Sequence, residues 1–155
     1  MKQNKITILD INKEMFETKL NNIDANKISE TIEKASSYIV DGEELILSSN
    51  EIKYNNKKTE INSYDNIALI LEKLGAKKIK SKEFKKTLYN LDNVKISFES
   101  WPLIPRFASL EGNEEEVRNI FQKLNMTNRT TTYGINDIYE EIYGIDLEDI
   151  KNLRF

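Results

Sequence analysis

The chain has 155 residues, no cysteine and no histidine, and its 23 basic and 26 acidic side chains give a net charge of −3. This length predicts one domain over residues 1–155, and the lack of cysteine excludes disulfides and thiolate metal sites. The charge balance disfavours general DNA binding, and without a long apolar run or a signal-peptide pattern we expect a cytoplasmic protein with no membrane contact.

The first part of the chain favours a strand and then a short helix. Residues 1–11 alternate between apolar and polar side chains as a strand does, and residues 12–22 carry apolar side chains at helical spacing. Residues 24–41 would serve either as a strand or as a weak helix. Their end, at residues 38–42, favours a strand.

The middle of the chain predicts short strands followed by a helix. Residues 44–49 favour a strand, and residues 52–61 favour a hairpin that turns at Asn55 and Asn56. An amphipathic helix over residues 64–75 follows, because the segment begins after a serine and ends at a glycine. We expect this helix to cover the sheet.

Six lysines lie between residues 77 and 91, at positions 77, 78, 80, 82, 85 and 86. A charge run of this kind is usually a solvated face, so the simplest interpretation is a solvent-exposed pair of strands.

A predicted hairpin with its corner at Trp101 and Pro102 carries two glutamates. Residues 94–99 alternate, which puts Glu99 on the polar side of the first strand, and the second strand puts Glu111 on a side shared with serine. The hairpin should therefore present both carboxylates on one polar face. We expect Gly112 to break the second strand.

Helices are predicted to end the chain. Asn113, with a glutamate three residues later, gives the N-cap pattern of a helix over residues 114–124. Two further short helices are expected over residues 135–143 and 146–153.

The run from Tyr89 to Gly112, Y-N-L-D-N-V-K-I-S-F-E-S-W-P-L-I-P-R-F-A-S-L-E-G, resembles the C-terminal half of the CYTH superfamily. This superfamily contains the class IV adenylate cyclases and the thiamine triphosphatases. The tail from Thr132 to Ile145, T-Y-G-I-N-D-I-Y-E-E-I-Y-G-I, resembles the way bacterial members end. The resemblance implies an α+β fold with an antiparallel β-barrel, the triphosphate tunnel, whose lumen binds metal through acidic residues and phosphate through basic residues.

The same resemblance implies which side chains would form the site. Phosphate or nucleotide contacts would come from Lys57 and Lys86. If the protein is active, Mg²⁺ or Mn²⁺ would be held by Glu60, Glu99 and Glu111. No residue is assigned as the catalytic group, and the partner would be a nucleotide or another phosphorylated small molecule, with a homodimer possible.

Two motifs of the superfamily are degenerate in this chain. The first strand of the family carries E-x-E-x-K, and the aligned positions here are Gln3, Lys5 and Thr7. The family's L-R-x-R strand is here the apolar run Leu-Ile-Leu followed by serine, at residues 45–48. Removing one charged group from a dry site can cost a few kcal/mol of transition-state stabilisation, so catalysis is expected to be weak or absent.

Each site residue also has a purely structural interpretation. Glu111 would equally serve as an exposed glutamate that caps the next helix, and Glu99 as a cap of the Trp101-Pro102 turn. Lys86 and Glu60 are assigned from alignment and strand parity. Trp101 is most simply a packing residue at the hairpin corner.

Three functions remain open at this point. The first is a CYTH-like protein that binds a nucleotide or another phosphorylated small molecule, with weak or absent catalysis. The second is an active metal-dependent adenylate cyclase or triphosphatase. The third is an interaction or sequestering protein whose lumen has become partly apolar through Ile46, Phe84 and Ala108.

Overall fold

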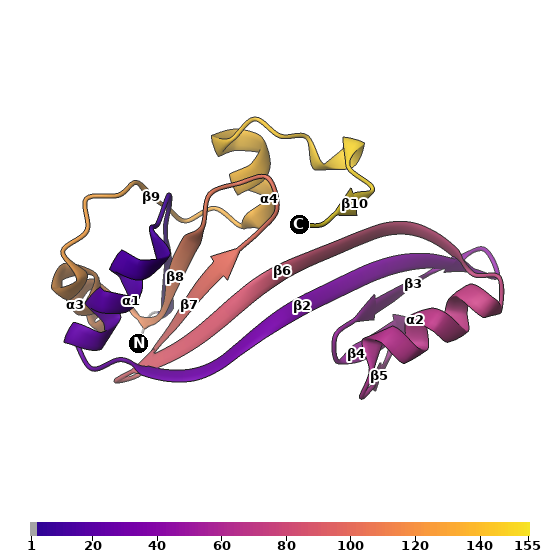
Figure 1. The fold of residues 1–155 in the computed structure, drawn as a ribbon, viewed down its shortest axis with the longest axis horizontal. Coiled ribbons are helices and arrows are strands. Elements are labelled where there is room, and N and C mark those ends of the chain that lie inside the picture. Colours follow the sequence, from indigo (N-terminus) through magenta and orange to yellow (C-terminus); the bar gives the residue numbers. More distant parts are fainter. Residues whose placement is uncertain (1–2) are drawn as a thin grey trace. The chain divides into compact units, whose positions relative to one another are not determined.

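The computed structural model describes residues 3–155, which form a mixed α+β fold around one ten-stranded sheet (Figure 1). Residues 1 and 2, where the predicted first strand would begin, lie outside the described residues. In chain order the elements are β1 (Gln3–Ile8), α1 (Lys13–Asn22), β2 (Asn26–Val40), β3 (Glu43–Ser48), β4 (Glu51–Tyr54), β5 (Lys57–Glu60), α2 (Tyr64–Lys73), β6 (Lys77–Leu91), β7 (Val94–Ser100), β8 (Phe107–Asn113), α3 (Glu114–Leu124), β9 (Thr130–Thr131), α4 (Ile135–Asp137), η1 (Ile138–Ile142), η2 (Leu147–Asp149) and β10 (Asn152–Leu153).

The strands follow the order β5-β4-β3-β2-β6-β7-β8-β1-β9, and β10 pairs with β6. The strand pairs whose residue-by-residue pairing is described are antiparallel, except that β10 pairs with β6 in parallel. Among residues 3–155 no pairing joins the two outer strands, β5 and β9, so the sheet is open along this path. The predicted α+β class is confirmed.

The chain forms two compact units. Unit 1 comprises residues up to 31 and residues 85–145, and unit 2 comprises residues 32–84 and 146–155. The strands β2 and β6 each contribute residues to both units, because the division falls within them.

Unit 1 has its core on one face of the strands β1, β7 and β8, where α1 and α3 cover them (Figure 1). The side chain of Asn12 accepts a hydrogen bond from the amide of Met15 at 3.0 Å and so caps α1. Asn113 caps α3 in the same way through the amides of Glu115 and Glu116. The buried core residues are Ile8, Ile11, Phe16, Leu20, Tyr89, Val94, Ile96, Phe98, Ala108, Leu110, Val117, Ile120 and Leu124. Both predicted helices are therefore confirmed, and Asn113 is the predicted cap of the second.

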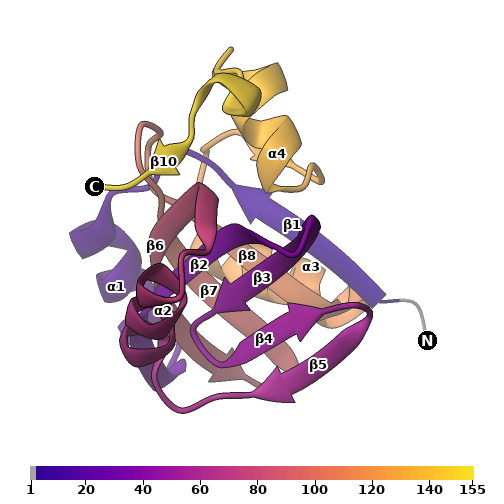
Figure 2. The same cartoon turned by 90° about the vertical axis from the view of Figure 1, so that its right-hand side faces the viewer.

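Unit 2 is built on the β3–β4–β5 meander and the helix α2, which Figure 2 shows side by side. The Ser63 hydroxyl caps α2 by accepting from the amide of Asn66 at 3.3 Å, as the sequence predicted. Tyr38, Leu45 and Leu47 form the buried centre, and partly buried side chains of α2 pack against it. The hairpin turn at Asn55 and Asn56 is also confirmed, with φ of 51° and 63°, left-handed values that asparagine tolerates.

Three sequence predictions need correction. Residues 77–91 form one strand of 15 residues, β6, and not a pair of strands. The segment that the sequence left open between strand and helix is a strand of the same length, β2, which is one of the two alternatives and agrees with the strand favoured at its end. Gly112 lies within β8 and does not break it. A Cβ at this position would lie 2.9 Å from the carbonyl oxygen of Asn93, so glycine is needed for close backbone approach.

The third correction concerns the end of the chain. The predicted helix over residues 135–143 is present, as α4 followed directly by the π-helical turn η1. The predicted helix over residues 146–153 is wrong, because only one 3₁₀ turn forms before the strand β10. Ser81 explains the difference: its amide donates to the carbonyl of Lys151 at 2.8 Å, and its hydroxyl donates to Asn152 at 2.7 Å. These contacts to β6 replace the local bonds of a helix.

Candidate functional site

The strands of unit 1 carry a polar face opposite the covered core. Directly paired residues in a sheet project to the same side, so the register defines this face. We call it the polar face, and its polar members are Lys5, Thr7, Lys86, Lys95, Ser97, Glu99, Ser109 and Glu111. The predicted placement of Glu99 and Glu111 on one side of the hairpin is confirmed.

Lys86 and Glu99 occupy directly paired positions of β6 and β7, and both side chains are half-buried. Cβ atoms of such pairs lie about 4.5–5.5 Å apart, so the two side chains start from adjacent points of the face, although the described residues show no ion pair between them. The Glu99 carboxylate accepts hydrogen bonds from the Ser97 hydroxyl at 3.0 Å and from the Trp101 indole N–H at 3.1 Å. Neutral donors on both oxygens fix the direction of this carboxylate.

Packing at the hairpin corner holds Trp101, which is a hydrogen-bond donor to Glu99. Trp101 is buried and meets the ring of Tyr139 edge-on, with centroids 6.3 Å apart. The Tyr139 hydroxyl donates to the carbonyl of Pro102 at 2.6 Å, and burial raises the pKa of this tyrosine well above its usual value. Trp101 is thus the expected packing residue, and it is also a hydrogen-bond donor to the site, a role that the sequence did not predict.

A row of hydroxyls crosses the middle of the polar face. Thr7, Ser97 and Ser109 occupy paired positions and are all buried. The hydroxyls of Thr7 and Ser109 are 3.1 Å apart and share a hydrogen bond. This row of buried hydroxyls, each already in a hydrogen bond, separates the Lys86–Glu99 end of the face from the Glu111 end.

Glu111 lies between two lysines. Its paired residue in β1 is Lys5 and its paired residue in β7 is Lys95, and all three side chains are exposed. These three side chains together therefore have one more positive than negative charge. Neither Lys5 nor Lys95 was predicted as a site residue, although strand parity places both on this side. Lys5 lies beside Glu111 only because β1 pairs with β8, which is distant in the sequence, whereas Lys95 lies beside it through the register of the β7–β8 hairpin.

The two glutamates of the polar face do not converge. Glu99 pairs with Phe107 in β8, and Glu111 lies four residues further along that strand. At about 3.3 Å a residue, their backbone positions are about 13 Å apart along the strand. A Mg²⁺ ion needs oxygen ligands at about 2.1 Å, so the arrangement does not favour one ion between these side chains. Residues 3–155 contain no group of three or more acidic, histidine or cysteine side chains placed to hold a metal.

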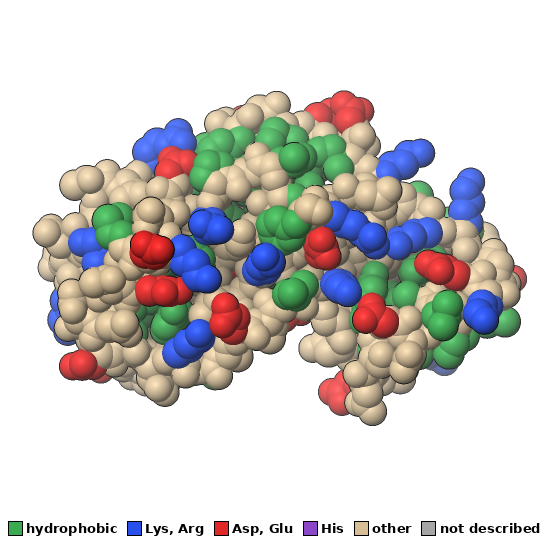
Figure 3. All heavy atoms as spheres, viewed as in Figure 1, with side chains coloured by type: hydrophobic (Ala, Val, Ile, Leu, Met, Phe, Trp, Pro, Cys, Tyr) green, Lys and Arg blue, Asp and Glu red, His purple; other side chains and the backbone are tan. Residues whose placement is uncertain are grey.

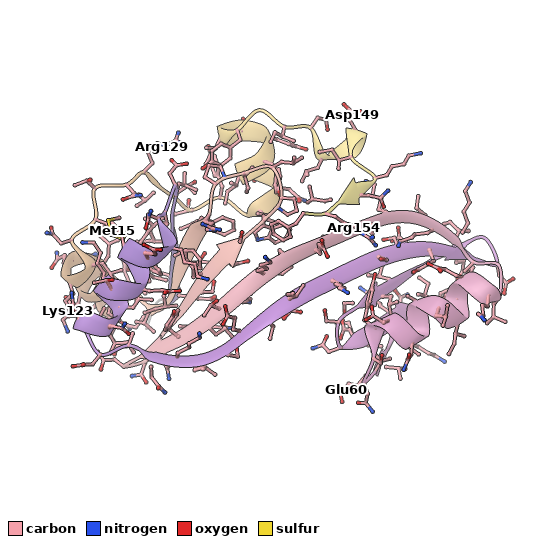
Figure 4. All side chains as sticks on the ribbon, in the orientation of Figure 1. Met15, Glu60, Lys123, Arg129, Asp149 and Arg154 are labelled. Atoms are coloured by element: carbon pink, nitrogen blue, oxygen red, sulfur yellow. The ribbon has the colours of Figure 1, made fainter. Side chains whose placement is uncertain are left out.

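Lys57 and Glu60 belong to unit 2, whereas Lys86, Glu99 and Glu111 belong to unit 1. Lys57 pairs with Tyr54, on the face that α2 covers, and Glu60 pairs with Glu51 on the opposite face. Both predicted residues are exposed, and Figure 4 shows Glu60 on the β4–β5 hairpin. The two side chains do not share a face, so this hairpin does not present them to a ligand together.

The three residues that were expected to make a lumen apolar differ in burial and in the side of the sheet on which they lie. Ile46 pairs with Lys53, away from the α2 side, and is 38% exposed. Phe84 is half-buried on β6. Ala108 is fully buried in the core beneath α1 and α3, so the expectation that it could face a lumen is wrong.

No protein-family model matches this chain, and no curated protein matches it. Solved structures do resemble it. A putative adenylate cyclase from Vibrio parahaemolyticus has a TM-score of 0.59 at 14% identity, covering 89% of this chain and 97% of its own. The PH1012 protein from Pyrococcus horikoshii has a TM-score of 0.53 at 13% identity, covering 81% of this chain and 92% of its own. The PH1819 protein from the same organism has a TM-score of 0.52 at 14% identity, covering 91% of this chain and 99% of its own.

At these identities a structural match shows the fold and not the activity. The described part of the chain also contains no helix that is both long enough and apolar enough to span a membrane. The comparisons therefore support one conclusion: this chain has the fold of these proteins, one of which is described as a putative adenylate cyclase.

Proposed function

We propose that the protein binds a nucleotide or another phosphorylated small molecule on the polar face of unit 1, with catalysis weak or absent. The observation that carries this proposal is the placement of three lysines on one face that also presents a central row of hydroxyls. Lys86 lies at one end of this face, and Lys5 and Lys95 flank Glu111 at the other. Ammonium groups and hydroxyls are the donors that phosphate oxygens accept from.

Membership of a degenerate branch of the CYTH superfamily and a triphosphate tunnel belong to the same proposal. They are supported by the run from Tyr89 to Gly112 and by the fold shared with the Vibrio protein. A cytoplasmic location and a possible homodimer stay predictions from the sequence.

A resident Mg²⁺ or Mn²⁺ ion does not fit the polar face. Glu111 has a lysine on each side, and a nearby ammonium disfavours a cation at that carboxylate. Glu99 is directed by two hydrogen bonds toward its own strand and corner. We therefore derive no step through a metal, and we propose that the charge of the bound phosphates is balanced chiefly by lysine.

The test is a thermal-shift and calorimetric titration with ATP, thiamine triphosphate and inorganic tripolyphosphate, with and without Mg²⁺. A ligand at 100 times its Kd should stabilise the protein by about 2.7 kcal/mol. Lys86→Gln and Lys95→Gln should each weaken binding by about tenfold or more, because a hydrogen bond to a charged group contributes about 1.5–3 kcal/mol.

Lys123→Gln is the matched control. It removes the same charge from the same unit, but it lies on α3, which covers the opposite face of the strands (Figure 4). Equal affinity in all three variants would contradict the proposed site. The absence of any shift with these ligands would instead favour an interaction protein.

An active cyclase or triphosphatase is the second candidate, and the fold shared with the putative cyclase favours it. Mass spectrometry of the same samples separates the two. A new product mass that depends on Mg²⁺ or Mn²⁺ would establish an enzyme, whereas unchanged ligand in a stabilised sample would support a binding protein.

A further inference from the structure

Unit 2 contains a pocket of its own, which the polar face does not include. Its volume is about 340 Å³, near the lower end of the usual range of about 300–1,000 Å³ for small-molecule sites. It lies beside α2 and the unit 2 portion of β6. The lining residues are Lys34, Tyr64, Asp65, Ala68, Leu69, Glu72, Lys78, Lys82, Glu83 and Arg154.

Basic side chains reach this pocket from three segments. Lys78 and Lys82 come from β6, Arg154 follows β10, and Lys34 comes from β2. Figure 3 shows lysine and arginine side chains gathered over this part of β6, and Figure 4 labels Arg154 above it. Among the described residues, neither Lys78 nor Arg154 takes part in an ion pair.

Two of the three acidic lining residues are already engaged within the protein. Asp65 pairs with Lys34 at 3.4 Å, and the Lys34 ammonium also lies 5.9 Å from the centre of the Tyr64 ring. Glu83 accepts a hydrogen bond from the amide of Phe155 at 3.2 Å. The lining as a whole has four basic and three acidic side chains, so it carries one more positive than negative charge.

The core of unit 2 contains a buried hydroxyl without a hydrogen-bond partner, on a tyrosine that does not itself line the pocket. Tyr38 is fully buried, and its hydroxyl makes no hydrogen bond of normal geometry within the described chain. The nearby Ser36 hydroxyl is bonded to the hydroxyl of Tyr64. A buried polar group without a partner costs free energy, so it calls for an explanation such as a missing ligand.

The alternation of side chains along β2 puts Tyr38 on the same side of the strand as Lys34, which lines the pocket. Burial raises the pKa of Tyr38, and the neighbouring Tyr64 and Glu72 raise it further, while Ser36 and Arg154 act in the opposite direction. Tyr64, Glu72 and Arg154 all line the pocket. The hydroxyl is therefore close to the groups that a bound molecule would contact.

We propose that this pocket is a second site, which binds a small phosphate monoester. Lys78, Lys82 and Arg154 would surround the phosphate, whose double negative charge matches three basic groups better than a carboxylate does. The Tyr38 hydroxyl is buried behind the lining side chains, so it would donate to a phosphate oxygen only if binding displaces one of them, and the organic part would lie against Ala68 and Leu69. This site is independent of the function proposed for unit 1.

The test uses phenyl phosphate as the probe and the full chain labelled with ¹⁵N. Saturable changes in amide shifts are expected at Ala68, Leu69 and Lys78, and Arg154→Gln should weaken the affinity by about tenfold or more. Lys86→Gln, on the polar face of unit 1, is the control and should bind phenyl phosphate as the parent does. No saturable change at α2 and β6, or equal affinity in Arg154→Gln, would overturn the proposal.

Tyr38→Phe gives a second, independent measurement. Because it removes a buried hydroxyl that has no partner, the free protein should melt at the same temperature as the parent or higher, while phenyl phosphate should bind about tenfold more weakly. An unchanged affinity for phenyl phosphate would show that the Tyr38 hydroxyl does not contact the ligand. A lower melting temperature of the free protein would mean that the hydroxyl already has a partner, and would also overturn the assignment.

Discussion

The indole N–H of Trp101 donates to a carboxylate oxygen of Glu99 across 3.1 Å, so the corner of the β7–β8 hairpin holds the acidic group that faces Lys86. This hydrogen bond joins a buried packing residue to the polar face. Changes at the corner should therefore affect both stability and ligand binding.

Trp101→Phe tests this coupling. The variant keeps an aromatic ring beside Tyr139 but loses the hydrogen bond and part of the packing, so we expect a loss of about 1–3 kcal/mol in the free energy of unfolding. Urea denaturation measures it. Glu99→Gln is the matched comparison, because its amide oxygen can still accept from the indole; equal losses in the two variants would show that the indole bond is not the dominant contribution.

Glu111→Gln separates two roles of the same carboxylate. If the flanking Lys5 and Lys95 bind phosphate directly, removing the negative charge between them should raise the affinity for tripolyphosphate several-fold without metal, and high salt should reduce the gain. If Glu111 binds a metal ion, the same variant should lose Mg²⁺-dependent binding. Isothermal titration with and without Mg²⁺, at low and high salt, distinguishes these results.

Gly112→Ala should destabilise unit 1 by about 1–3 kcal/mol, the usual cost of overpacking. The added Cβ would lie 2.9 Å from the carbonyl oxygen of Asn93 and 3.3 Å from the Cα of Val94, and backbone atoms cannot move aside cheaply. Gly134→Ala is the control, since nothing lies within 4 Å of its added Cβ. Thermal unfolding measures both; similar melting temperatures would contradict the close approach.

Tyr143 should make stability depend on alkaline pH. Burial raises the pKa of this hydroxyl to about 12, and its 2.8 Å hydrogen bond to Asp10 adds to the effect. Because the pKa in the folded state is above the ordinary value of 10, the contribution is complete below pH 10 and is lost as the pH rises toward 12. Between these pH values the free energy of unfolding should fall more in the parent than in Tyr143→Phe. Chemical denaturation at pH 9 and pH 11 measures this difference. Tyr133→Phe, at an exposed tyrosine, is the control.

The alternation of residues 94–99 and 107–111 was enough to predict the hairpin and its polar side, because side-chain direction in a strand depends only on local parity. The neighbours of Glu111 were not predictable in the same way. Lys5 is more than a hundred residues away in the sequence, and the pairing of β1 with β8 alone brings it there. Site residues defined by strand register are thus the ones that sequence reasoning missed.

Long-range pairing also explains the errors in secondary structure. Residues 26–40 have no clear period, and they are extended because β3 pairs with them along six consecutive positions. Residues 146–153 carry charges and apolar groups at helical spacing, yet β6 offers their backbone a partner at Ser81. In both segments tertiary hydrogen bonding decided between conformations that local propensity left close in free energy.

The short pairing of β10 with β6 also covers part of a backbone edge. Asn152 and Leu153 occupy the backbone hydrogen-bonding groups of Ser81 and Lys82, along a strand whose exposed edge would otherwise be a template for another chain. Shortening the chain before Lys151 would uncover that edge, so intermolecular strand addition and aggregation are the expected consequence. The last residues therefore occupy a strand edge that another chain could otherwise extend.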